Sequence, residues 1–81
     1  MLFISLLSPK GKGKEAVDYL KGLKAPKGVT IRDICITFGR YDGMILFESP
    51  DQKTALNFAL EIGFATDYVI ETLSAVPVKE L

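Results

Sequence analysis

The sequence VTIRDICITFGRYDGMILFESPDQKTALNFALEIG, residues 29–63, decides the fold. Residues 29–38 are rich in β-branched side chains and predict a long strand, and the apolar residues 44–47 predict a second strand after a tight turn. A helix should follow, because Ser49 can act as its N-cap and Pro50 fits the first helical position. This half of the chain therefore has the order strand, strand, helix.

The flanking segments supply the other half of the fold. Residues 2–8 predict a strand, residues 14–24 a short helix with apolar residues along one side, and residues 68–75 a last strand. The order β-α-β-β-α-β is that of the ferredoxin-like α+β fold, in which a four-stranded antiparallel sheet carries two helices on one face. We expect residues 1–81 to form this single domain.

The second predicted helix has one apolar side that should face the sheet. It is expected to end at Gly63, because glycine commonly terminates helices. Beyond the last strand, residues 78–81 are expected to fray. The helix residues expected to be buried are Ala55, Leu56, Ala59, Leu60 and Ile62.

The composition excludes several kinds of chemistry. The 81 residues include one cysteine and no histidine or tryptophan, and 48% are hydrophobic. One cysteine cannot form an internal disulfide, and without histidine there is no His-based triad, imidazole base or His metal ligand. No cofactor or metal is predicted. Cys35, in the middle of an apolar strand, is expected to be a buried, inert thiol.

Neither a membrane nor a nucleic acid is a predicted partner. The apolar run at residues 1–7 ends at Ser8 and Pro9, too short for a signal peptide or a membrane span, so we expect a cytoplasmic protein. The net charge is zero, with +4 in residues 1–27 and −4 in residues 28–81. Such a split can orient association between copies, whereas a nucleic-acid-binding domain usually has a general basic excess.

The strands carry large apolar side chains on both faces, which predicts self-association. Two helices can cover only one face, so the other would leave roughly six large apolar side chains in water, each worth about 1.5–3 kcal/mol on full burial. A homodimer packed sheet against sheet would cover them, and higher oligomers stay open. The alternating sets are Leu2, Ile4 and Leu6 against Phe3 and Leu7, and Met44 and Leu46 against Ile45 and Phe47.

The turn Gly39-Arg40-Tyr41-Asp42 between the two middle strands is the foremost candidate site. Gly39 can take a positive φ, and the Asp42 carboxylate can accept backbone N–H groups of the turn. Tyr41 offers an aromatic face with a polar tip. Turn formation alone would explain the segment. The alternative is that Arg40, Tyr41 or Asp42 contacts a ligand.

Two glutamates and a second tyrosine are further candidates for ligand binding. Glu48 and Glu71 lie within predicted strands. Two carboxylates held close in an apolar barrel could act as an acid/base pair, but strand alternation leaves open whether they share a face. Solvated or paired carboxylates are the simpler interpretation. Tyr68, at the start of the last strand, could line a pocket as Tyr41 could.

The basic loop of residues 10–14, Lys-Gly-Lys-Gly-Lys, invites a comparison with phosphate-binding loops. Its glycine spacing is wrong for a Walker motif, and Glu15 stands where serine or threonine should follow the lysine. A looser anion site before a helix N-terminus is one alternative, and a solvated basic loop is the other.

Three separated motifs resemble the GYD domain family, and the resemblance covers residues 29–76. The motifs are Thr37-Phe38-Gly39-Arg40-Tyr41-Asp42, Phe47-Glu48-Ser49-Pro50-Asp51 before the alanine-containing helix, and Ile70-Glu71-Thr72-Leu73-Ser74-Ala75. Family members are small bacterial and archaeal proteins. The resemblance implies a dimeric α/β-barrel arrangement of ferredoxin-like units, and it carries no established activity.

Two other functions are open alternatives. The Gly-x-Tyr-Asp turn is also similar to the effector domain of the leucine-responsive regulators, which exists in stand-alone form and binds amino acids at subunit contacts; this would place Gly39, Tyr41 and Asp42 near a binding cleft. A cofactor-independent small-molecule enzyme of the dimeric α/β-barrel type is the third possibility. We favour a GYD-type oligomeric ligand-binding or assembly module with no catalysis of its own.

Overall fold

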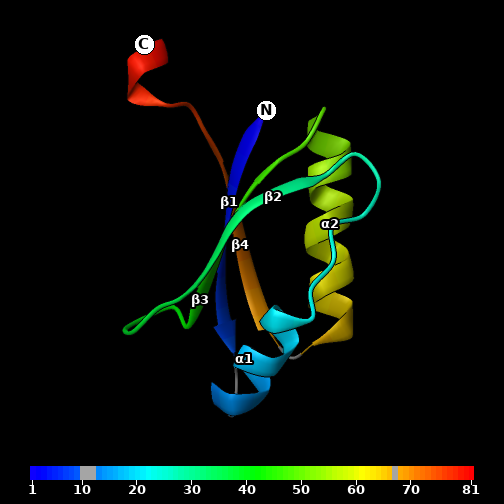
Figure 1. The fold of residues 1–81 in the computed structure, drawn as a ribbon, viewed down its shortest axis with the longest axis vertical. Coiled ribbons are helices and arrows are strands. Elements are labelled where there is room, and N and C mark those ends of the chain that lie inside the picture. Colours follow the sequence, from blue (N-terminus) through cyan, green and yellow to red (C-terminus); the bar gives the residue numbers. More distant parts are fainter. Residues whose placement is uncertain (10–12, 67) are drawn as a thin grey trace.

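The computed structural model describes residues 1–9, 13–66 and 68–81. It confirms the predicted order of strands and helices (Figure 1). The elements are β1 (Leu2–Pro9), α1 (Gly13–Lys21), β2 (Thr30–Ile36), β3 (Gly43–Glu48), α2 (Gln52–Ala65), β4 (Tyr68–Ala75) and the short 3₁₀ helix η1 (Val78–Glu80).

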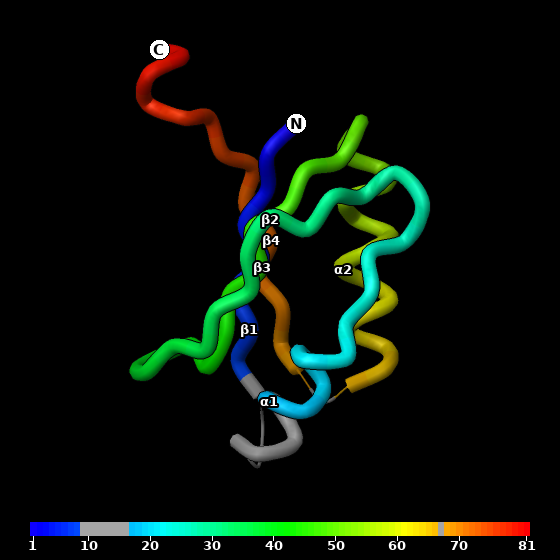
Figure 2. The backbone as a smooth tube through the Cα atoms, viewed as in Figure 1, coloured from blue at the N-terminus to red at the C-terminus, as the bar shows by residue number. Residues whose placement is uncertain are grey.

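The four strands form one antiparallel sheet in the order β2-β3-β1-β4. The two central strands, β1 and β3, are the most apolar segments of the chain, and the edge strands β2 and β4 carry more charged residues. Both helices lie on the same side of the sheet, as the tube in Figure 2 shows. This is the ferredoxin-like arrangement that the sequence predicts.

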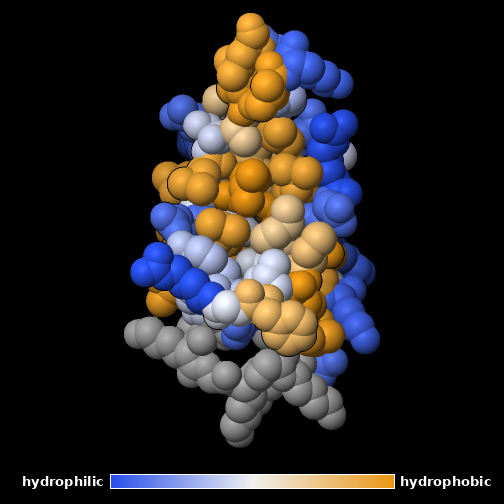
Figure 3. Space-filling model, turned by 90° about the vertical axis from the view of Figure 1, so that its left-hand side faces the viewer, coloured by the Kyte–Doolittle hydropathy of each residue, from blue (hydrophilic) through white to orange (hydrophobic). Residues whose placement is uncertain are grey.

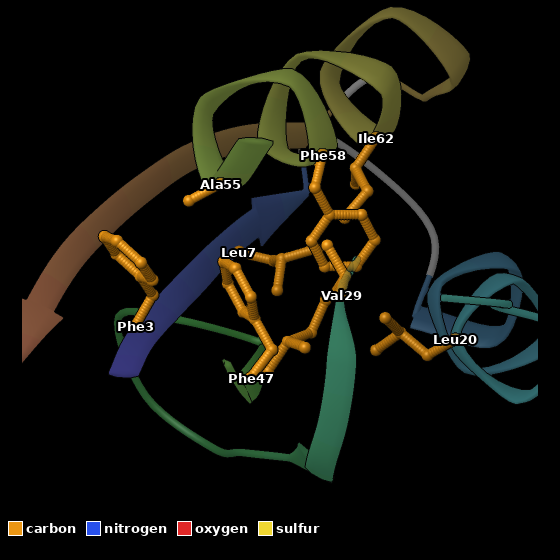
Figure 4. Close-up of a cluster of buried hydrophobic side chains, with 9 residues drawn as sticks. Phe3, Leu7, Leu20, Val29, Phe47, Ala55, Phe58 and Ile62 are labelled. Carbon is orange, nitrogen blue, oxygen red and sulfur yellow. The ribbon is translucent and has the colours of Figure 1, made fainter. Parts of the chain in front are cut away.

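The core lies between the sheet and the helices (Figure 4). The Phe47 ring, which is fully buried, stacks on Phe3 at a centroid distance of 5.5 Å and meets Phe58 edge-on at 4.9 Å. Aromatic pairs in these geometries add to the free energy gained from area burial. The buried cluster comprises Phe3, Leu7, Leu20, Val29, Ile45, Phe47, Ala55, Phe58 and Ile62.

The predicted buried side of α2 is partly wrong. Leu56 and Leu60 are 59% and 43% exposed, whereas Phe58 is 2% exposed. Ala55 and Ile62 are buried as expected, and Phe58 falls between them at helical spacings of three and four. The face of α2 that meets the sheet is therefore rotated from the predicted one, so that the large Phe58 ring can pack on Phe47.

The two ends of α2 also differ from the prediction. Asp51, not Ser49, is the N-cap, because its extended backbone lets the carboxylate accept the Thr54 N–H at 2.7 Å. Ser49 is buried two residues earlier, and its hydroxyl donates to the Asp51 carbonyl at 2.8 Å. The helix continues through Gly63 to Ala65, where Thr66 follows as C-cap. Hydrogen bonding to Thr54 lowers the pKa of Asp51, which keeps the cap charged.

Two segments project from the sheet on the side away from α2 (Figure 1). One is the loop at residues 37–42, which joins β2 to β3. The other is the C-terminal arm, residues 76–81. It includes η1, so the prediction that residues 78–81 fray is wrong. The arm follows Ala75 of β4, which pairs with Leu2, and the loop precedes Gly43 of β3, which pairs with Leu7. The two segments therefore start beside opposite ends of β1.

Candidate functional site

The sheet side turned away from the helices, here called the open face, carries three of the seven candidate residues: Tyr41, Glu48 and Glu71. Figure 3 shows a band of hydrophobic residues along it. In a single copy of the chain, the side chains of Val69 and Leu73 of β4 are 54% and 45% exposed on this face. The strand register assigns to the open face Thr30, Asp33 and Cys35 of β2, Met44, Leu46 and Glu48 of β3, Leu2, Ile4, Leu6 and Ser8 of β1, and Val69, Glu71, Leu73 and Ala75 of β4.

Tyr41 and Glu71 meet on the open face, although 30 residues separate them in sequence. The Tyr41 hydroxyl donates a hydrogen bond to Glu71 Oε2 at 2.5 Å. Glu71 lies opposite Leu6, which in turn lies opposite Met44, so the pair borders the apolar centre of the face. The structure thus brings together two of the residues predicted as ligand contacts, one from the turn and one from β4.

The loop that carries Tyr41 is held against β1 by backbone hydrogen bonds. The Asp42 N–H donates to the Leu7 carbonyl at 2.8 Å, and the Thr37 N–H donates to the Asp42 carbonyl at 3.1 Å. The Thr37 hydroxyl donates to the Tyr41 carbonyl at 2.6 Å, and Ser8 Oγ donates to the Arg40 carbonyl at 3.2 Å. These contacts fix the backbone on both sides of Tyr41 and so direct its ring toward β4.

The hydrogen bond favours the protonated form of Tyr41. It raises the pKa of Tyr41 above its ordinary value, with a smaller contribution from burial, while the charge of Arg40 acts in the opposite direction. Tyr41 is therefore a stable hydrogen-bond donor at neutral pH. The Glu71 carboxylate accepts this bond with one oxygen and leaves lone pairs for a second donor. The pair can accept a hydrogen bond from a cationic or N–H group of a ligand.

Glu48 and Glu71 share the open face, which answers the question that strand alternation left open. They are not neighbours, because Glu48 pairs with Leu2 at one end of β1 and Glu71 pairs with Leu6 near the other. Glu48 instead forms an ion pair with Arg32, with Nε and Oε2 3.3 Å apart. The alternative of an acid/base pair of carboxylates is therefore not assembled within one copy of the chain, and Glu48 is a paired carboxylate, as the simpler interpretation has it.

The Arg32–Glu48 ion pair lies beside an open cleft of about 340 Å³ between the sheet and the C-terminal arm. The lining residues are Met1, Leu2, Arg32, Glu48, Ser74, Ala75, Val76, Pro77 and Glu80.

The other predicted contacts lie elsewhere. Tyr68 is on the helix side of the sheet, where its ring meets Tyr19 edge-on at 6.0 Å, so it does not join Tyr41. Gly39 has the predicted positive φ of 122°. Arg40 is exposed, and within the described residues its side chain forms no ion pair. Asp42 is tied to the sheet by its backbone, and over the same residues its carboxylate accepts no hydrogen bond, contrary to the prediction.

The remaining predictions concern Cys35, metals and the basic loop. Cys35 is half-buried on the open face opposite Met44, so it is not enclosed by the core as predicted. No group of acidic or cysteine side chains in the described parts of the chain is arranged to hold a metal ion. None of the helices described is long and apolar enough to cross a membrane. The loop at residues 10–14 lies mostly outside the described residues.

Sequence reasoning missed one class of exposed residue. Phe38 in the 37–42 loop is fully exposed, and Val78 and Leu81 of the C-terminal arm are 84% and 91% exposed. A single exposed apolar side chain is ordinary on a monomer, so these three matter as a group, because they lie on the two segments that flank the open face. Their position next to turn and proline residues was the available signal, since such segments lie outside the core.

A comparison with known families now places this chain. No curated protein and no solved structure matches it. The sequence model of the GYD domain matches residues 7–81, which extends the resemblance beyond residues 29–76 to include the last residues of β1, all of α1 and the C-terminal arm. With nearly its whole length matched, the chain belongs to the GYD domain family.

Proposed function

We propose that this GYD-domain chain is a homodimeric small-molecule-binding module in which two open faces pack together around the Tyr41–Glu71 pairs. The single observation that supports it most is the open face itself. It is an apolar sheet surface, uncovered in one copy, with a hydrogen-bonded tyrosine–carboxylate pair at its border. An apolar surface rimmed by polar groups typically marks an interaction site.

The size of the face suits a dimer. Figure 3 views the molecule so that the face spans the longest and shortest extents, 38 and 18 Å. Their product, about 700 Å², is the projected area of the whole chain in this view and an upper limit for the flat area of the face. It is of the same order as the ~800 Å² of accessible surface that each partner buries in a standard interface. Covering the half-exposed apolar residues of both copies would contribute on the order of 10 kcal/mol, comparable with the ~4–15 kcal/mol lost in association.

The edges of the sheet add a second contribution. β2 and β4 are the outer strands, and each presents backbone N–H and C=O groups without a neighbouring strand. A second copy laid across the open face can pair with these edges. Such pairing adds hydrogen bonds to the burial of apolar area and would close the two sheets into a barrel.

A ligand for the dimer interior follows from the charges of the face. Once a second sheet covers it, the Glu71 carboxylate keeps one hydrogen bond from Tyr41 and has no described cation beside it. A carboxylate removed from water needs a further donor or a positive charge. We therefore expect a small molecule with an apolar body and an amine or other N–H donor, bound near each Tyr41–Glu71 pair.

A matched pair of variants tests the dimer. Leu73 on the open face and Leu60 on the outer side of α2 are 45% and 43% exposed. Substituting either leucine by aspartate should therefore have a similar effect on the stability of a single copy. Light scattering over a concentration series should give a dimer for the wild type and for Leu60→Asp, and a folded monomer for Leu73→Asp. A monomeric wild type, or equal behaviour of the two variants, would contradict the proposal. A higher oligomer would instead favour the amino-acid-sensing alternative.

Ligand binding has its own test. Native mass spectrometry of the purified dimer should reveal a co-purified small mass, and Glu71→Gln should lose it without loss of the dimer. Thr72→Ser, a change one residue away on the other face, serves as the control. Retention of the small mass by Glu71→Gln would show that the pair is not the binding site.

A further inference from the structure

The two projecting segments frame the open face and carry exposed apolar side chains at their tips. The 37–42 loop and the C-terminal arm both extend toward the side away from α2 (Figures 1 and 2). Phe38 is fully exposed on the loop, and Val78 and Leu81 are 84% and 91% exposed on the arm. Each segment therefore extends past the sheet at one end of the face, in the position where a second copy would lie.

The two segments cannot cover each other within one copy. The loop starts beside Leu7 of β1 and the arm starts beside Leu2. These two residues are five positions, or about 17 Å, apart along the strand. The molecule is 38 Å long in this direction, and Figure 1 shows the arm and the loop diverging. The loop therefore cannot cover the exposed side chains of the arm within one chain, and a surface that covers them has to come from a second molecule.

Two-fold symmetry allows two arrangements of facing sheets. If the axis runs along the strands, arm meets arm and loop meets loop. If it runs across the strands, the arm of each copy meets the loop of the other. In the second arrangement the exposed Phe38 ring meets two aliphatic side chains, Val78 and Leu81 of the other copy's arm, whereas in the first it meets only its own counterpart. Arg40 and Asp42 of the loop then face Lys79 and Glu80 of the arm, so each segment offers both signs of charge to the other.

We propose that the C-terminal arm of one copy packs on the 37–42 loop of a second copy, with Val78 and Leu81 against Phe38. This proposal rests on the homodimer proposed above and adds its orientation. It also gives the arm a direct part in the site, because the loop that the arm covers is the one that carries Tyr41. The dimer would then close over the Tyr41–Glu71 pair at both ends of the interface.

Cross-linking between two single-cysteine chains tests the contact. Both chains carry Cys35→Ser; one adds Phe38→Cys and the other, with a mass tag, adds Val78→Cys. The two are co-expressed and treated with a short bismaleimide. The expected main product is the mixed pair, and intrachain linkage is impossible because each chain has one cysteine. Each variant alone should give little cross-linked dimer.

The possible outcomes separate this inference from the proposed function. A main product of Val78→Cys with itself would show that the arms meet and would overturn the arm–loop contact. A dimer in light scattering with no cross-link would overturn the contact and leave the homodimer standing. A monomeric wild type would overturn both.

A second readout needs no cross-linker. The double variant Val78→Ser/Leu81→Ser should raise the dimer dissociation constant about tenfold or more, because two apolar side chains lose their covered surface. Lys79→Ser, on the same arm, should change it less than about threefold. Equal effects of the two changes would contradict the proposal.

Discussion

The two faces of this sheet are built from neighbouring residues with opposite environments. On β3, Ile45 and Phe47 are fully buried under the helices, while Met44 and Leu46, which alternate with them, lie half-buried on the open face. Both sets are strongly apolar, although a sheet with one solvated face usually alternates apolar and polar residues. The difference teaches that the helix face specifies the fold of one copy, whereas the open face has apolar side chains that this fold does not need.

The largest expected difference between the faces is in stability. Phe47→Ala should lower the free energy of unfolding by about 3–5 kcal/mol, because it leaves a cavity beside the Phe3 and Phe58 rings. Leu46→Ala should cost well under half as much at protein concentrations that keep the chain monomeric. Urea unfolding at low concentration measures both. Equal losses would mean that the open face already contributes fully to the fold of one copy.

Cys35 reports directly on the coverage of the open face. Its thiol lies there, half-buried opposite Met44. The rate of its reaction with a soluble disulfide reagent should fall as the protein concentration rises, in proportion to the fraction of monomer. In Leu73→Asp the rate should be high at every concentration. A rate that is independent of concentration in the wild type would show that nothing covers this face.

How far the sequence predicts the molecule also differs between the two faces. The order of elements, the bounds of β4 and the alternation along β1 and β3 follow from local patterns, and the structure confirms them. The N-cap at Asp51 and the burial of Phe58 do not, because they depend on how α2 rotates against the sheet. Local periodicity fixes which residues are on one side of a helix only to within a residue or two.

The candidate site was harder to predict for a related reason. Tyr41 and Glu71 each stood out separately, but their contact requires β4 to lie beside β1 and the loop to fold over the β1 end. The face of the sheet on which Glu48 and Tyr68 lie was likewise unknown before the register was known. Side-chain direction in a strand is set by register, and a shift of one residue moves a side chain to the other face.

The helix above the buried face offers a smaller, stabilising change. Gly63 was expected to end α2 but lies inside it, and a Cβ added there would meet only Ile70 Cδ1, at 3.8 Å. Gly63→Ala should therefore raise the free energy of unfolding by about 0.5–1 kcal/mol through helix propensity. Gly28→Ala, at a φ of 89°, should lower it instead. Urea midpoints at constant slope measure both, and a destabilised Gly63→Ala would contradict this description of α2.

The smallest expected effect is a titration on the open face. The hydrogen bond from neutral Tyr41 to Glu71 raises the pKa of Tyr41 in the folded protein. The bond therefore stabilises the fold fully at pH values below the ordinary tyrosine pKa, and this stabilisation is lost as the pH rises through the pKa of Tyr41 in the folded protein. The difference between absorbance titrations of the wild type and Tyr41→Phe isolates this tyrosine. The substitution Glu71→Gln should return the pKa of Tyr41 toward the ordinary tyrosine value. No change in Glu71→Gln would mean that the hydrogen bond does not persist in solution.

The central claim is that the open face meets a second copy, and the mass of the wild type in solution tests it most directly. The mass measured by sedimentation equilibrium should approach twice the 8.9 kDa of one chain as the concentration rises. On dilution the mass should fall reversibly toward that of one chain. A mass of one chain at every concentration would contradict the account.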